Sequence, residues 1–332
     1  MNKILLLAMA LSSGIALIPC ARADAPGAEF AVPHRLVDIG GRRLNLFCSG
    51  SGSPTVVFDA PAGSAAWVWW AVQPAVAAKT RACVYDRAGF GFSDLSPRAG
   101  SSGNAVDDLH RLLAAAGIAP PYVLVGNSLG GGNMELFAWQ HPGEVSGLVL
   151  VEPMHEDDVA RADEASQGKL AAAQGEMFAL RTACAQQAEK GFEPHTEMWD
   201  QCVVGPDPAF PAALGAADLK QRMAPPYWRA SKAEQDAFDT DYAQMRTARK
   251  PFGDLPLVVL ARGVSPYLVP GRPPSDINKA IEAANLKLLT AVARSSTNGE
   301  LRVVPDASHM IQEMRPDAVA AAVDDLLLRI KR

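Results

Sequence analysis

The chain has no excess of basic residues. Its 332 residues include 31 Lys and Arg against 36 Asp and Glu, so the formal net charge is −5 at pH 7. A modest acidic balance, spread along the chain, argues against nucleic acid or an anionic membrane as the main partner. Internal repeats, heptad arrays and long low-complexity tracts are also missing from the sequence. The length suffices for one large α/β core with an inserted subdomain.

A long uninterrupted apolar run is absent too. The most apolar stretch, residues 4–18, is interrupted by polar residues and is too short to favour a membrane-spanning helix. Lys3 precedes this stretch and Ala21-Arg22-Ala23 follows it, which gives the charge, apolar core and small-x-small cleavage site of a secretory signal peptide. We therefore expect residues 1–23 to be removed and the mature protein to be periplasmic or secreted, without stable membrane insertion.

Cysteine is scarce, with five residues in the whole chain. The four that remain after the expected cleavage do not form a disulfide scaffold, but they allow two bridges in an oxidising compartment. Cys184 and Cys202 lie in one inserted region, and we expect them to pair. Cys48 and Cys83 each lie in an expected strand, where a bridge and two buried thiols are equally compatible with the sequence.

The sequence does contain a regular alternation of apolar, β-branched runs with amphipathic segments. This series predicts an α/β fold in which a mostly parallel sheet carries helices on both faces. We expect eight strands, over residues 35–41, 43–48, 55–58, 81–85, 122–125, 147–151, 255–260 and 301–304.

The alternation stops after the sixth expected strand and resumes only at the seventh. The intervening stretch reads as helical and is punctuated by prolines. We therefore divide the mature chain into a core, residues 24–153 and 254–332, and an inserted helical cap, residues 154–253. Most of the cap's large apolar residues should form its own core, and some could line a substrate pocket beneath it.

Gly126-Asn127-Ser128-Leu129-Gly130 follows one of the expected strands and opens a helix. This is the setting of a nucleophile elbow, in which a sharp turn exposes the serine hydroxyl and glycines let strand and helix approach. The pattern predicts Ser128 as a catalytic nucleophile. A serine hydroxyl needs a base, and the base needs a carboxylate that orients it.

His309 is the best candidate for the base among the six histidines. It lies in the loop after the last expected strand, where its side chain can return to the carboxyl edge of the sheet. Elbow enzymes of this type have the chain order Ser, acid, His, and His309 fits that order.

The carboxylate is assigned to Glu152, at the tip of the strand that follows the elbow helix. There its side chain would emerge beside Ser128 on the same sheet edge. Asp276 is the alternative, because the acid often follows the penultimate strand, but it is far along the chain from that strand's end. Asp157 and Asp158 are further candidates. Alternatively, Glu152 could merely stabilise the first helical turn of the insertion.

Two backbone N–H groups are expected to form an oxyanion hole. One is that of Leu129, which follows the nucleophile. The other should lie after the third strand, where we choose Ala62, since Pro61 has no N–H to donate.

The elbow, the segment Tyr85-Asp86-Arg87-Ala88-Gly89-Phe90-Gly91-Phe92-Ser93-Asp94 and the terminal Ser308-His309-Met310 together resemble the α/β-hydrolase superfamily, in its cap-bearing serine hydrolase branch. The resemblance implies that Asp86 and Arg87 are architectural. It departs from the common pattern where Ala60-Pro61 replaces the usual His-Gly before the oxyanion residue. The acid at Glu152 is placed as in some haloalkane dehalogenases.

Those dehalogenases, like epoxide hydrolases, use an aspartate nucleophile, so Ser128 favours acyl transfer to water through an acyl-enzyme. The expected function is an exported serine hydrolase that acts on a carboxylic ester, or less readily an amide, of a small to medium apolar substrate. No metal or organic cofactor is expected. The alternatives are a C–C bond hydrolase or cofactor-free perhydrolase on the same triad, and a binding protein that kept the fold without turnover.

Overall fold

A computed structural model describes residues 26–269 and 271–331. The expected signal peptide, residues 1–23, lies outside the described residues. Within them, no helix is both long enough and apolar enough to cross a membrane.

Eight strands of the described residues form one sheet, in the order β1-β2-β4-β3-β5-β6-β7-β8. The pairs β1 with β2 and β2 with β4 are antiparallel, whereas the remaining neighbours are parallel. The strands are β1 (Arg35–Asp38), β2 (Arg43–Ser49), β3 (Thr55–Asp59), β4 (Ala82–Tyr85), β5 (Tyr122–Asn127), β6 (Val145–Val151), β7 (Leu257–Arg262) and β8 (Gly299–Val304). The predicted class of fold is confirmed.

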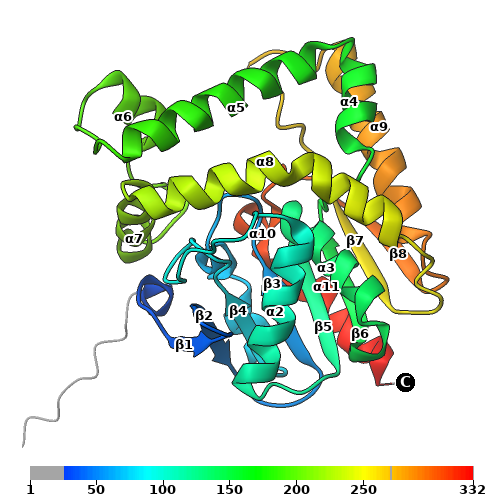
Figure 1. Cartoon of the computed structure of the whole chain (residues 1–332). Coiled ribbons are helices and arrows are strands. Elements are labelled where there is room, and N and C mark those ends of the chain that lie inside the picture. The colour runs from blue at the N-terminus through cyan, green and yellow to red at the C-terminus, as the bar shows by residue number, and fades with distance from the viewer. Residues whose placement is uncertain (1–25, 270, 332) are drawn as a thin grey trace, which may run out of the picture.

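Helices cover both faces of this sheet (Figure 1). Successive residues of a strand point to opposite faces. Val57 and Leu124 therefore pack with α2 (Ser102–Ala116), α3 (Leu129–Gln140) and α9 (Asp276–Ala293), whereas Val56 and Val123 pack with α1 (Gln73–Ala77) and α11 (Pro316–Ile330). Short helices complete the core: η1 (Ala28–Ala31), η2 (Ala66–Trp69), η3 (Pro142–Glu144) and α10 (Ile311–Met314).

The segment between β6 and β7 forms a lid of helices. They are α4 (Asp158–Ser166), α5 (Lys169–Ala188), α6 (Glu197–Cys202), α7 (Ala212–Arg222) and α8 (Pro225–Ala248). Figure 1 shows α8 between α5 and the core, and α8 contacts both α2 and α3. The lid has a small apolar cluster of its own around Cys184, Cys202 and Trp228.

Two disulfides join neighbouring elements. Cys48 and Cys83 face one another in the register of β2 and β4 and are bridged. Cys184 and Cys202 are bridged as expected, which ties α5 to α6 at the centre of the lid's apolar cluster.

Candidate active site

Ser128 occupies a sharp turn between β5 and α3. Its backbone has φ 53° and ψ −121°, and non-glycine residues rarely adopt a positive φ. The amide of Ser128 donates to the carbonyl oxygens of Val151 (3.1 Å) and Glu152 (3.2 Å), which holds the turn against the end of β6. A Cβ atom on Gly126 would lie 2.3 Å from the carbonyl oxygen of Gly130. Strand and helix can therefore approach this closely only because these positions lack side chains.

The loop that carries His309, between β8 and α10, is tied to the end of β5 by Asn127. The Asn127 amide donates to the carbonyl oxygens of Val151 (2.9 Å) and His309 (3.2 Å), and its own oxygen accepts from Gln312 (3.2 Å). The side chain next to the serine thus places the histidine loop. As a result, Ser128 and His309 line the same cavity.

Glu152 lies at the end of β6, beside His309. The distance from Glu152 Oε2 to His309 Nδ1 is 3.5 Å, and the glutamate is only 3% exposed. Glu152 has φ 44°, so the backbone bends directly after β6, and this bend directs the Glu152 side chain toward His309. The structure therefore brings together the three side chains that the sequence placed at this edge of the sheet.

Arg262, at the end of β7, also binds the carboxylate of Glu152. Its guanidinium forms an ion pair with Glu152 Oε2, and its backbone N–H donates to Oε1 at 2.8 Å. Glu282, on α9, accepts a hydrogen bond from Arg262 Nε through its Oε2, at 2.8 Å. Burial acts to raise the pKa of Glu152, but His309 and Arg262 outweigh burial and lower that pKa. The carboxylate is thus kept ionised beside the imidazole.

Two of the other candidate acids lie away from His309, and the third lines the same cavity. Asp276 begins α9 directly after the N-cap Ser275, and its side chain is 98% exposed and paired with Lys279 at 2.9 Å. Asp157 forms an ion pair with Arg246 at 3.3 Å on the surface of the lid. Asp158 lines the cavity, and burial raises the pKa of its carboxyl to about 6.

The loop after β3, residues 59–63, lies against the start of α3. A Cβ atom on Gly130 would lie 2.5 Å from the carbonyl oxygens of both Asp59 and Ala60, so this contact also requires glycine. Within the described residues, the backbone amides of Ala62 and Leu129 have no protein acceptor. The backbone amide of Gly63, in contrast, donates to Glu234 Oε2 at 2.8 Å. The two amides expected to serve as oxyanion donors are therefore available.

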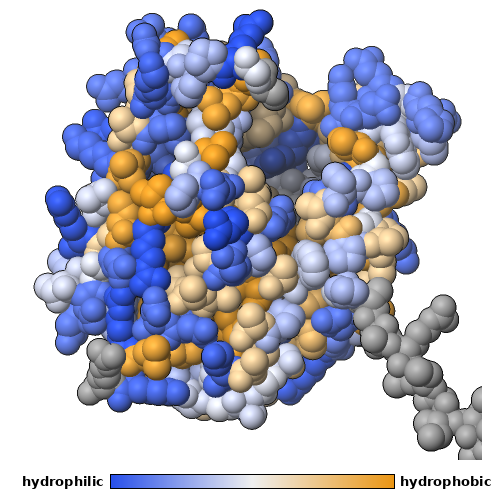
Figure 2. All heavy atoms as spheres, turned by 180° about the vertical axis from the view of Figure 1, so that it is seen from behind, coloured by the Kyte–Doolittle hydropathy of each residue, from blue (hydrophilic) through white to orange (hydrophobic). Residues whose placement is uncertain are grey.

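A cavity of about 420 Å³ lies at this edge of the sheet and reaches the lid. One wall holds Ser128, Glu152 and His309. Nine apolar side chains from α4, α5 and α9 also line the cavity: Val159, Ala162, Leu170, Ala173, Met177, Ile281, Ala284, Leu288 and Leu289. Figure 2 shows a hollow on the lid side of the molecule, bordered by both hydrophobic and hydrophilic residues.

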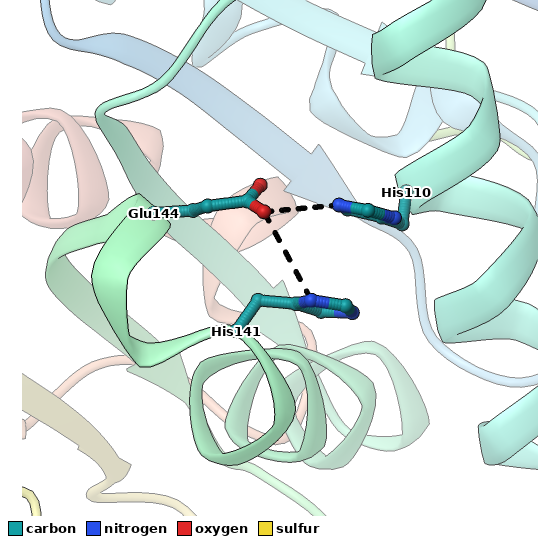
Figure 3. Close-up of side chains that lie close together, drawn as sticks. All are labelled: His110, His141 and Glu144. Atoms are coloured by element: carbon teal, nitrogen blue, oxygen red, sulfur yellow. Dashed lines mark hydrogen bonds and ion pairs between the residues drawn. The ribbon is translucent and has the colours of Figure 1, made fainter.

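A second group of titratable side chains lies where α3 ends, opposite its start at Ser128. Glu144 is 3.0 Å from His110 Nε2 and 4.0 Å from His141 Nδ1 (Figure 3). The two imidazole rings are stacked at 4.0 Å and are almost parallel, at 8°. Parallel rings direct their lone pairs side by side rather than toward one metal ion, which needs both nitrogens at about 2.0–2.1 Å. The geometry fits a hydrogen-bonded stack better than a preformed metal site.

A family model for the alpha/beta hydrolase fold matches residues 54–188, which run from β3 to the end of α5. Solved structures extend the likeness to 90% of this chain. An esterase from Thermogutta terrifontis is 21% identical, with a TM-score of 0.59 and 99% of its chain covered. A chain described as an ancestral haloalkane dehalogenase is 17% identical, with a TM-score of 0.64 and 99% of its chain covered. The described chain therefore has the α/β-hydrolase fold, and residues 54–188 match the family model for that fold.

Curated relatives match shorter segments of this chain. A Hormonema carpetanum protein named "Probable transporter efuK" is 36% identical over 127 residues, which are 35% of this chain and 18% of that protein. The 2-hydroxymuconate semialdehyde hydrolase of Pseudomonas sp. (strain CF600) is 36% identical over 120 residues, 35% of this chain and 42% of that protein. The matches span 15% to 42% of the length of the curated relatives.

The family match and the shared fold agree with the resemblance that the sequence motifs predicted. The solved structures share too little sequence with this chain to show more than its fold. Two contacts of the site have no counterpart in the sequence motifs. These are the ion pair and hydrogen bond of Arg262 with Glu152, and the hydrogen bond of the Asn127 side chain to the loop that carries His309.

Proposed function

We propose that this α/β hydrolase is a serine hydrolase that cleaves a carboxylic ester, less readily an amide, of a small to medium apolar molecule. The observation that supports the proposal best is the meeting of Ser128, His309 and Glu152 in the wall of one largely apolar cavity. The serine in the elbow supports acyl transfer over the chemistry of an aspartate nucleophile.

In the proposed mechanism, His309 takes the proton of Ser128 as the hydroxyl attacks the ester carbonyl. The N–H groups of Ala62 and Leu129 stabilise the oxyanion of the tetrahedral intermediate, each contributing about 3 kcal/mol by the measured cost of losing one such donor. His309 then gives its proton to the departing alcohol, and an acyl-enzyme forms. Water, deprotonated by the same imidazole, releases the acid product.

Glu152 holds His309 in the tautomer that leaves Nε2 free to accept the serine proton, and it stabilises the imidazolium that follows. Arg262 binds both oxygens of the carboxylate, Oε2 through its guanidinium and Oε1 through its backbone N–H, and so fixes the orientation of Glu152. The acyl or alcohol part of the substrate would lie against the apolar side chains of α4, α5 and α9, which explains the preference for an apolar molecule.

Export is part of the proposal. The pattern of a signal peptide over residues 1–23 supports it, and so do the two disulfides, which persist in oxidising compartments.

A second candidate function is C–C bond hydrolysis on the same three side chains. The relative named 2-hydroxymuconate semialdehyde hydrolase favours this alternative. Faster turnover of 2-hydroxymuconate semialdehyde than of any ester would select it.

The test is a series of p-nitrophenyl esters of rising acyl length. We expect hydrolysis by the wild type and a loss of kcat/KM of at least about 10⁴-fold in Ser128→Ala, because the residual rate of a triad enzyme without its nucleophile comes from binding and the oxyanion hole alone. A folded, oxidised wild-type protein that turns over no ester would contradict the proposal and favour a binding protein.

A further inference from the structure

A buried ion cluster connects the loop of residues 59–63 to the lid. The guanidinium of Arg87 donates to Asp59 Oδ1 (2.6 Å) and to Glu234 Oε1 (2.8 Å). Glu234 belongs to the lid helix α8, whereas Arg87 and Asp59 belong to the core. All three residues are 5% exposed or less. Burial acts to lower the pKa of Arg87, but the two carboxylates outweigh burial and raise it, so the guanidinium stays protonated.

The same cluster holds the backbone of the loop. Arg87 donates to the carbonyl oxygens of Ala60 (2.6 Å) and Pro61 (2.8 Å), and Glu234 Oε2 accepts from the amide of Gly63 (2.8 Å). One ion pair between core and lid therefore binds backbone groups on both sides of Ala62.

These bonds determine where the amide of Ala62 points. The C=O and N–H groups of a trans peptide point in opposite directions, and the peptide bond between Pro61 and Ala62 is trans. Since the oxygen of Pro61 points at Arg87, the N–H of Ala62 points away from the ion cluster. Gly63 is excluded as the donor because its amide is bound to Glu234.

From this geometry we infer that Glu234 is a positioning residue for the oxyanion hole, through which the lid helix orients the amide of Ala62; the inference rests on the proposed function. Glu234 acts through Gly63 and Arg87 and does not touch the substrate. Without the Glu234 carboxylate, the Gly63 amide loses its acceptor and Arg87 keeps only Asp59 as a carboxylate partner, so the peptide that carries the Ala62 N–H is held less firmly.

The test replaces Glu234 by Gln, Asp and Ala and measures kcat and KM on the best p-nitrophenyl ester. Gln keeps an acceptor for Gly63 without the charge, Asp keeps the charge with a shorter reach, and Ala keeps neither. We expect kcat to fall by about 10- to 100-fold in Glu234→Ala, part of the loss seen when an oxyanion donor is removed outright, with smaller losses for Gln and Asp. KM should stay within about twofold of the wild type, because only the transition state carries the oxyanion.

A second readout separates positioning from a general structural role. A trifluoromethyl ketone analogue of the ester forms a tetrahedral adduct whose oxyanion occupies the hole. Its affinity should fall by the same factor as kcat in each variant. The matched control is Asp236→Asn, an acid-to-amide change on the exposed face of α8, where the carboxylate pairs with Lys232 (2.6 Å). This variant should keep wild-type kcat and affinity.

Circular dichroism and urea unfolding identify the variants that fold, and Glu234→Asp provides the test if the Ala and Gln variants do not. Unchanged kcat and unchanged analogue affinity in a folded variant overturn the inference, as does a rise in KM at constant kcat. A wild type that hydrolyses no ester contradicts the proposed function instead, so the two failures are distinguishable.

Discussion

At the scale of the residue, the carboxylate of Glu152 contacts two cationic partners. His309 and the guanidinium of Arg262 approach the same oxygen, while the other oxygen accepts from the backbone of Arg262. The arginine comes from the end of β7, the strand after which such an acid is often found. Glu152, at the end of β6, is therefore held by Arg262, which lies at the end of β7, where the acid of such a site is more often found.

This arrangement predicts a large difference between two acid-to-amide changes. Glu152→Gln should lower kcat by about 10⁴-fold, by analogy with a studied triad, because an amide stabilises the wrong tautomer of the histidine. Asp276→Asn should leave kcat within about twofold of the wild type, because that side chain is exposed and lies outside the cavity. Steady-state kinetics on one ester measures both variants. A severe loss in Asp276→Asn alone would show that the acid is misassigned.

Replacing Glu135, on α3, should increase the stability of the protein by an amount that depends on pH. It is 1% exposed, one of its oxygens has no partner among the described residues, and burial raises the pKa of its carboxyl to about 8. Between about pH 4.5 and pH 8, the folded state keeps a proton that the unfolded state has released, so this group costs stability as the pH rises. Glu135→Gln should therefore add about 4 kcal/mol at pH 8 and almost nothing at pH 4.5, given about 1.4 kcal/mol per pKa unit.

Urea unfolding at the two pH values measures this gain. The exposed Glu176, on α5, provides the matched control, and Glu176→Gln should change the free energy of unfolding by less than about 0.5 kcal/mol at either pH. An equal effect of Glu135→Gln at both pH values would show that the carboxyl titrates normally.

Sequence patterns indicated Ser128, His309 and Glu152 because each follows a strand or opens a helix in a recognisable place. Their catalytic roles stay predictions. The patterns could not indicate Arg262 or Glu234, which act on groups more than a hundred residues away. Such long-range side-chain contacts depend on packing and leave no local periodicity in the sequence.

At the scale of the element, the turn between β5 and α3 depends on close backbone contact. Gly130 faces the carbonyl oxygens of Asp59 and Ala60, and backbone atoms cannot move aside as a flexible side chain can. This one position therefore sets the approach of the loop of residues 59–63 to the elbow.

Gly130→Ala should consequently displace that loop. We expect kcat to fall by about 10- to 100-fold, because a donor of the oxyanion hole moves, and stability to fall by about 1–3 kcal/mol from overpacking. Gly175→Ala, in the middle of α5 with open space around its Cα, should instead be neutral or stabilising by up to about 1 kcal/mol. Kinetics and urea unfolding of both variants measure the difference. A Gly130→Ala protein with wild-type kcat would show that the contact is not needed.

The strands of the core were predictable because a fully covered parallel sheet makes every strand a compact apolar run, as in β5, whose residues are all buried. The lid was predictable only as a helix-rich interruption. The bounds of α5, α6 and α8 depend on the bridge between Cys184 and Cys202 and on the packing of Trp228 against it. Tertiary contacts of this kind override local helix preference.

At the scale of the whole molecule, the lid and the core enclose the cavity together. The core supplies the reactive side chains at the carboxyl edge of the sheet, and α4, α5 and α9 supply the apolar walls. The contact of Glu234 with the loop of residues 59–63 makes the lid part of the chemistry as well as part of the pocket. The proposed chemistry requires that the hydroxyl of Ser128 be activated within this cavity.

Intact-mass analysis after treatment with a fluorophosphonate probe tests that requirement most directly. The folded, oxidised wild type should gain one adduct that peptide mapping places on Ser128, and Ser128→Ala should gain none. His309→Ala should react far more slowly, because its hydroxyl lacks a base. Absence of an adduct on the folded wild type, or an adduct on another residue, would contradict the account.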